Sequence, residues 1–199
     1  MIERLARRFV TWQIRHCYLS AEEEKLYQYA FELLIGQAVN LMIACLLAVI
    51  FRAYIPVFVF LLAFIPLRSY AGGHHADSFN VCTMVSALIL LSVCLLSRIT
   101  FSEKMILTMG MVFAAVCGVL ICFLAPLEDQ NKPLDQSERL RYGRWSRYIW
   151  GLEAAAWFIC YHRQIRQASL GIMSAHLAVA GLLLAGVIKR KRIMNRRIS

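Results

Sequence analysis

Long runs of apolar residues, separated by short polar segments, dominate this sequence of 199 residues. A helix needs about 20 mostly apolar residues to cross the hydrocarbon core of a bilayer. Four runs meet that length, at 31–51, 79–97, 105–127 and 169–188. The second and third contain no Asp, Glu, Lys or Arg. These four runs predict four transmembrane helices.

Two shorter runs, 53–67 and 148–161, raise the predicted number of spans to six. The first is uncharged with prolines near its ends, and the second contains Glu153. At 60% hydrophobic and 17% charged residues, the composition is that of a membrane protein rather than a soluble domain. We therefore expect an all-α polytopic membrane protein in which residues 1–199 form one membrane-embedded domain.

The first thirty residues lack the apolar core of a signal peptide and are basic and amphipathic instead. Ile2, Leu5 and Phe9 follow helical spacing, with arginines between them. Residues 1–30 thus predict an amphipathic segment whose helix lies in the membrane surface. Ser20 and Glu23 form a capping-box pattern that could begin the helix entering the first span.

Basic residues are distributed asymmetrically about the predicted spans. If the N-terminus is cytoplasmic, six spans place 17 of the 22 Lys and Arg residues in cytoplasmic segments. Cytoplasmic loops of membrane proteins concentrate these residues. The net charge of +10 is therefore explained by topology, with both termini cytoplasmic, and it points to the bilayer rather than to nucleic acid as the partner.

The seven cysteines are scattered through apolar runs and form no CxxC pair. An odd, dispersed set predicts packing residues rather than a disulfide framework. Cys82 is different, because it lies at the start of the third span, after a segment rich in chemically active residues. That segment, 68–82, contains Gly72-Gly73, which permits unusual backbone and close approach of a ligand, and His75, which could activate the thiol. The alternative is that the histidines are simple polar anchors at the interface.

Two segments resemble the accessory gene regulator protein B (AgrB) family, the membrane endopeptidases of Gram-positive quorum sensing. The first comprises Arg68, Gly72-Gly73, His75-Ala76 and Cys82. The second, 125–134 (APLEDQNKPL), is similar to the family's cytoplasmic motif after the fourth span. Chain length, the amphipathic N-terminus and the six predicted spans agree, so the resemblance covers nearly the whole chain.

The resemblance implies a cysteine endopeptidase of the plasma membrane of a Gram-positive bacterium, without metal or cofactor. Its substrate would be a short AgrD-like signal propeptide, cleaved between signal and tail through a thioester and then cyclised to a thiolactone or lactone. Cys82 would be the nucleophile and His75 the general base and acid. Arg68, Gly72 and Gly73 would support them. The family also suggests a homodimer.

Other residues have two interpretations each. His74 could replace His75 as base, although the motif favours the histidine directly before Ala76. Asp77, Ser78 and Glu128 could orient the imidazole. Alternatively, Asp77 is a turn residue or a cap for the third span, and Glu128 is a solvated loop carboxylate. A basic stretch could attract an acidic propeptide tail or simply set the topology; it comprises Lys132, Arg139, Arg141, Arg144 and Arg147. Glu153 and His176 could pair across the last two helices.

Three rival functions remain open at the level of sequence. A transporter of a small molecule or peptide would suit six spans, but the halves show no symmetry. A metalloprotease could use His74, His75, His162 and His176, but HExxH is absent. A membrane scaffold would have no catalytic product.

Overall fold

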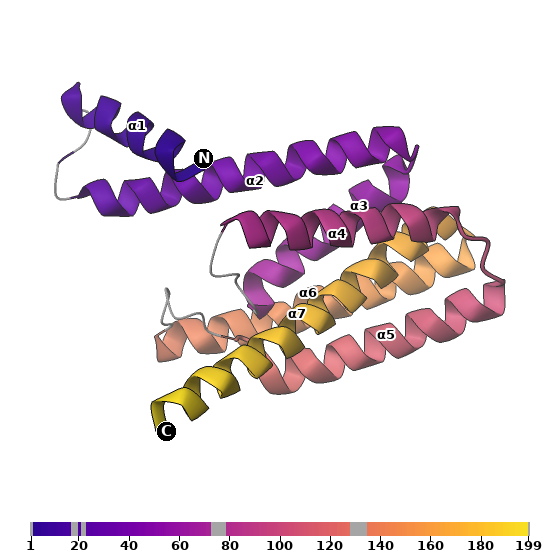
Figure 1. The fold of residues 1–199 in the computed structure, drawn as a ribbon. Helices are drawn as coiled ribbons and strands as arrows, with labels where there is room; N and C mark the ends of the chain where they lie inside the picture. The colour runs from indigo at the N-terminus through magenta and orange to yellow at the C-terminus, as the bar shows by residue number, and fades with distance from the viewer. Residues whose placement is uncertain (1, 17–19, 21–22, 73–78, 128–134, 199) are drawn as a thin grey trace.

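The computed structural model describes residues 2–16, 20, 23–72, 79–127 and 135–198. In this part of the chain the structure is all-helical (Figure 1). The helices are α1 (Ile2–Arg15), α2 (Glu24–Ile50), α3 (Tyr54–Ala71), α4 (Phe79–Arg98), α5 (Glu103–Leu124), α6 (Gln136–His162) and α7 (Arg166–Ile198).

Five of these helices contain a stretch long and apolar enough to cross a membrane, judged by length and composition. They correspond to the predicted spans at 31–51, 53–67, 79–97, 105–127 and 169–188. Several helices are longer than the apolar runs, because backbone hydrogen bonding continues through polar residues. The segments are Glu24–Ile50, Tyr54–Ala71, Val81–Arg98, Glu103–Leu124 and Arg166–Lys191.

The sixth predicted span, 148–161, forms the second half of α6. This helix has 27 residues and packs against α3, α5 and α7, beside which it runs in Figure 1. It does not meet the length and apolarity of a span, because the part that follows its four arginines is short and contains Glu153. Six spans with cytoplasmic termini therefore stay a prediction.

α1 packs on the first half of α2 through a small apolar face (Figure 1). Ala6 and Val10 are buried there, and the Phe9 ring lies 5.1 Å from the Phe31 ring. The expected cap at Ser20 was wrong. The Ser20 hydroxyl donates to the Glu23 carboxylate at 3.1 Å, and Glu23 takes the N-cap position without a side-chain cap.

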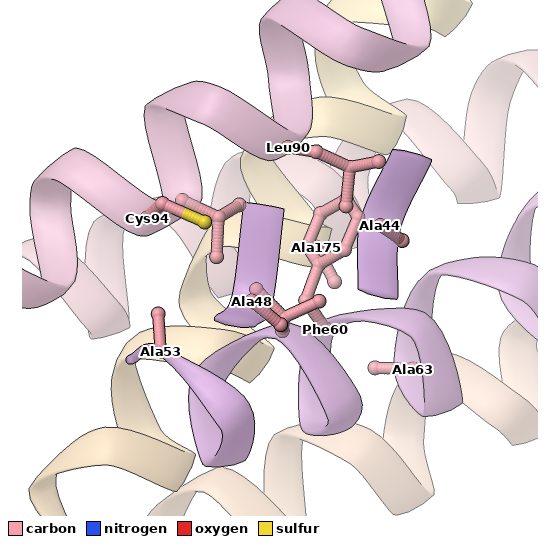
Figure 2. Packing of buried hydrophobic residues seen from close by; sticks show 10 residues of the cluster. Ala44, Ala48, Ala53, Phe60, Ala63, Leu90, Cys94 and Ala175 are labelled. Atoms are coloured by element: carbon pink, nitrogen blue, oxygen red, sulfur yellow. The ribbon is translucent and has the colours of Figure 1, made fainter. Parts of the chain in front are cut away.

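Small residues let α2, α3, α4 and α7 approach closely. Figure 2 shows Phe60 of α3 among alanines of neighbouring helices, with Leu90 and Cys94 of α4 beside them. A Cβ atom at Gly171 of α7 would lie 2.8 Å from the Pro56 carbonyl oxygen of α3. Close backbone approach of this kind is typical of helix association in bilayers, where dispersion replaces the hydrophobic effect as the driving force.

Two glycines of α5 receive tryptophans of α6. A Cβ atom at Gly110 would lie 1.9 Å from the Trp157 ring, and one at Gly118 would lie 2.3 Å from the Trp150 ring. Between them, the Trp150 indole N–H donates to the Ala114 carbonyl at 3.0 Å. The absence of two side chains on α5 thus fixes the position of α6 along it.

Glu153 of α6 meets His176 of α7, as the sequence suggested. Glu153 Oε2 and His176 Nε2 are 3.2 Å apart, and the histidine is fully buried. Among the described residues, neither atom has a hydrogen-bond partner in good geometry, so the contact is a close polar approach with a poorly aligned N–H direction. Each group nevertheless spares the other an entirely apolar environment.

Filling either glycine gap on α5 with a methyl group should weaken the contact between α5 and α6. We expect Gly110→Ala or Gly118→Ala to destabilise the protein by about 1–3 kcal/mol, because the added methyl overlaps an indole ring. The measurement is unfolding of the purified protein in mixed micelles. Gly151→Ala of α6 is the matched control, since nothing lies within 4 Å of its added Cβ. Equal stability of all three variants would contradict this packing.

Replacing only one of Glu153 and His176 should destabilise the protein more than expected from that residue alone, because the other polar group is left without its neighbour. Glu153→Leu and His176→Leu each leave a polar group alone among apolar side chains, whereas the double variant leaves neither. In the same unfolding assay we expect a coupling free energy of about 1 kcal/mol or more. Strictly additive effects would show that the two groups do not interact.

Candidate functional site

Cys82 lies in the first turn of α4, where its side chain is partly exposed. Cys94 and Cys117 are instead buried between helices, as the packing interpretation predicted. Cys45 and Cys122 lie on exposed faces of apolar helices. Cys82 thus combines partial accessibility with a position at the end of a predicted span.

A main-chain junction joins the two segments that the sequence singled out. The Leu127 amide donates to the Ala71 carbonyl at 3.0 Å, and Gly72 forms a parallel bridge with Leu127. Gly72 caps α3 with a φ of +71°, a conformation that residues with a side chain rarely adopt. A Cβ atom there would lie 2.3 Å from the Leu127 carbonyl oxygen. Only glycine allows α3 and the segment after α5 to meet this closely.

α6 covers the other side of the same segment. A Cβ atom at Gly143 would lie 3.2 Å from Pro126 Cδ and 3.5 Å from the Ala125 carbonyl oxygen. Ser146 is buried below it and donates to the Gly143 carbonyl at 3.0 Å. Residues 125–127 are therefore held between the C-terminal end of α3 and the first half of α6.

An aromatic cluster adjoins this junction. The Tyr70 ring on α3 lies 5.5 Å from Tyr142 and 6.1 Å from Trp145 on α6. Tyr148 continues the cluster, 6.4 Å from Trp145, and both rings are exposed. Sequence reasoning missed these residues, although the spacing of 142, 145 and 148 along one helix was a usable signal. Exposed rings beside arginines can bind a peptide chain.

The predicted basic residues occupy the same region. Arg139, Arg141, Arg144 and Arg147 are all exposed on the first half of α6. Arg68 lies in the last turn of α3, and its carbonyl accepts the Gly72 amide at 3.2 Å. The four exposed arginines therefore place positive charge on the surface of this half of α6.

Asp135 and Glu138 form a capping box at the start of α6, a pattern that sequence reasoning also missed. The Asp135 amide donates to the Glu138 carboxylate at 3.3 Å, and the Ser137 hydroxyl donates to Asp135 at 3.0 Å. The Gln136 amide, followed by that hydroxyl, holds the pKa of Asp135 below its ordinary value. The carboxylate thus favours the folded state at neutral pH, and this contribution is lost as the pH falls through its pKa.

Several predicted site residues lie outside the described residues, so their positions stay predictions. They are Gly73, His74, His75, Asp77, Ser78, Glu128 and Lys132. The helix ends that flank them, those of α3, α4, α5 and α6, lie at one end of the bundle (Figure 1). Within the described ranges, no group of three or more His, Cys, Asp or Glu residues is arranged to hold a metal ion.

Substitution of Gly72 should separate the two segments. We expect Gly72→Ala to destabilise the protein by about 1–3 kcal/mol, because the new methyl overlaps the Leu127 carbonyl at an unfavourable φ. The measurement is detergent unfolding. Gly181→Ala on α7 is the control, with open space around its added Cβ. A Gly72→Ala protein as stable as this control would contradict the junction.

Comparison with known proteins places these features in a family. The family model for accessory gene regulator B matches residues 2–185. Two curated relatives, an AgrB-like protein 2 of Clostridium perfringens strain 13 and an AgrB-like protein of strain SM101, are each 29% identical over 123 residues. That region covers 59% of this chain and spans 57% of each relative's length. No solved structure matches. This chain belongs to the accessory gene regulator B (AgrB) family.

Proposed function

We propose that this protein is a membrane cysteine endopeptidase of accessory gene regulator signalling. It removes the C-terminal tail from a short signal propeptide and supports cyclisation of the remainder. The observation that carries the proposal is the Gly72–Leu127 junction. It brings together two segments that resemble the family's motifs, at the end of the bundle where α4 begins and where Cys82 lies partly exposed in its first turn.

Cys82 and His75 divide the first chemical step. His75 takes the thiol proton, and the sulfur attacks the carbonyl carbon between signal and tail. The C–N bond breaks, the imidazolium returns the proton to the leaving amine, and an acyl thioester remains on Cys82. A Cys or Ser side chain of the substrate then attacks this thioester. His75 takes the proton of this side chain as the new S–C or O–C bond closes the ring. The bond between the acyl carbon and the Cys82 sulfur breaks, and the proton passes to the released Cys82 thiolate.

A thioester intermediate suits the proposed cyclisation, and the surface around the site suits a peptide substrate. A thioester retains the activation that ring closure needs, provided that water is restricted while the substrate side chain approaches. The exposed arginines of α6 offer charge complementarity to an acidic tail, and the aromatic cluster offers apolar surface for the peptide. A second copy of the chain is the partner that the family suggests.

Co-expression with a short amphipathic peptide encoded beside this protein's own coding sequence tests the proposal. Mass spectrometry measures the released tail and the cyclic product. Cys82→Ser should lower tail release at least about a thousandfold, and His75→Ala at least about a hundredfold, through loss of nucleophile and base. Iodoacetamide should inhibit, and a chelator should not.

Cys122→Ser is the matched control, because this cysteine is also accessible but lies at the last turns of α5. It should process the peptide as the unsubstituted protein does. An unchanged yield of tail from Cys82→Ser protein would remove the cysteine mechanism. Loss of processing with chelator alone would favour a metalloprotease.

A further inference from the structure

A shallow pocket of about 490 Å³ lies on the outer face of α1, away from the site discussed above. Its lining residues are Arg7, Arg8, Thr11, Trp12 and Arg15. They are spaced three, four and seven apart, so their side chains share one stretch of the helix surface. Three guanidinium groups at this spacing repel one another unless an anion lies between them.

The side chains that the structure describes supply no such anion. Among the acidic side chains that the structure describes, which do not include that of Glu3, none forms an ion pair with Arg7, Arg8 or Arg15. The Thr11 hydroxyl donates to the Arg7 carbonyl at 2.8 Å, which leaves its oxygen free to accept but not to neutralise charge. The pocket therefore offers donors and positive charge to a ligand from outside the chain. Arginine suits phosphate oxygens, because its planar fork binds two of them at once.

The position of the pocket relative to the expected bilayer indicates which kind of molecule supplies the phosphate. The opposite face of α1 is buried on α2, and Phe9 contacts Phe31, the first residue of the apolar run at 31–51. The pocket is thus level with the start of a membrane-spanning stretch, where lipid phosphates lie. Phe9 and Trp12 are each 50% exposed beside the arginines. A bilayer interface would cover these rings, whereas a soluble anion or a nucleic acid would leave them in water.

We propose that this pocket binds the phosphate headgroup of an anionic phospholipid. Arg7, Arg8 and Arg15 hold the phosphate oxygens, Thr11 accepts from a headgroup hydroxyl, and Trp12 with Phe9 contacts the upper acyl chain. Bound lipid would hold α1 at the membrane surface against α2. This inference does not depend on the peptidase activity.

Native mass spectrometry of the full-length, detergent-solubilised protein with phosphatidylglycerol or phosphatidylcholine tests it. We expect one tightly retained phosphatidylglycerol, and no equivalent phosphatidylcholine. The variant Arg7→Gln/Arg8→Gln/Arg15→Gln should bind this lipid about a hundredfold more weakly, at roughly fivefold for each arginine. Arg→Lys at the same positions keeps the charge but loses the fork, and should give an intermediate affinity.

The control variant, Lys189→Gln/Arg190→Gln/Lys191→Gln, removes the same charge from α7 and should retain the lipid. Helical content by circular dichroism checks that each variant is folded. If the glutamine variant does not fold, the Arg→Lys variant still tests the proposal, because it should bind the lipid more weakly than the unsubstituted protein. Equal phosphatidylglycerol binding by all variants, or equal loss in the α7 control, would overturn the proposal. Displacement of the lipid by millimolar inorganic phosphate or by a polyglutamate peptide would also overturn it, in favour of a free-anion or acidic-peptide site.

Discussion

The hydrogen bond from the Leu127 amide to the Ala71 carbonyl connects the ends of α3 and α5, which are remote in sequence. Two main-chain segments can meet this way only where neither carries a side chain in the gap, and Gly72 satisfies that condition. The junction in turn positions Pro126 against Gly143 of α6. Three helices therefore depend on one contact for their arrangement at the candidate site.

The sequence predicted the helices well because apolar runs in a bilayer must satisfy their backbone hydrogen bonds internally. It underestimated their lengths, since the same bonding continues into water through polar residues. α2 begins at Glu24 rather than near Phe31, and α6 begins at Gln136, well before its apolar half. The amphipathic N-terminal helix was expected from the helical spacing of its apolar residues, but its contact with α2 through Ala6 and Val10 required coordinates.

For the candidate site too, some features were predictable from the sequence and others were not. Residue types and local spacing pointed to Cys82 and Gly72, because a thiol and a glycine turn are visible in a short window. The Gly72–Leu127 bridge and the ring contact of Tyr70 with Tyr142 were not predictable. Each joins residues that are far apart in the sequence, and no local sequence pattern shows that they meet in the fold. The pairing of Glu153 with His176 was foreseeable, because ionisable groups within apolar helices have few alternatives to each other.

α6 has two chemically different halves, and this limits how it can move along its neighbours. Its first half carries arginines that favour water and headgroups, while Trp150 and Trp157 occupy fixed gaps on α5. A shift of one turn along α5, about 5.4 Å, would carry guanidinium groups toward the apolar helices around α6 and lift both indoles from their gaps. Piston-like sliding is thus opposed from both halves of the helix. Any rearrangement that admits a peptide beside residues 125–127 is left with tilting of α6, or with displacement of its neighbours.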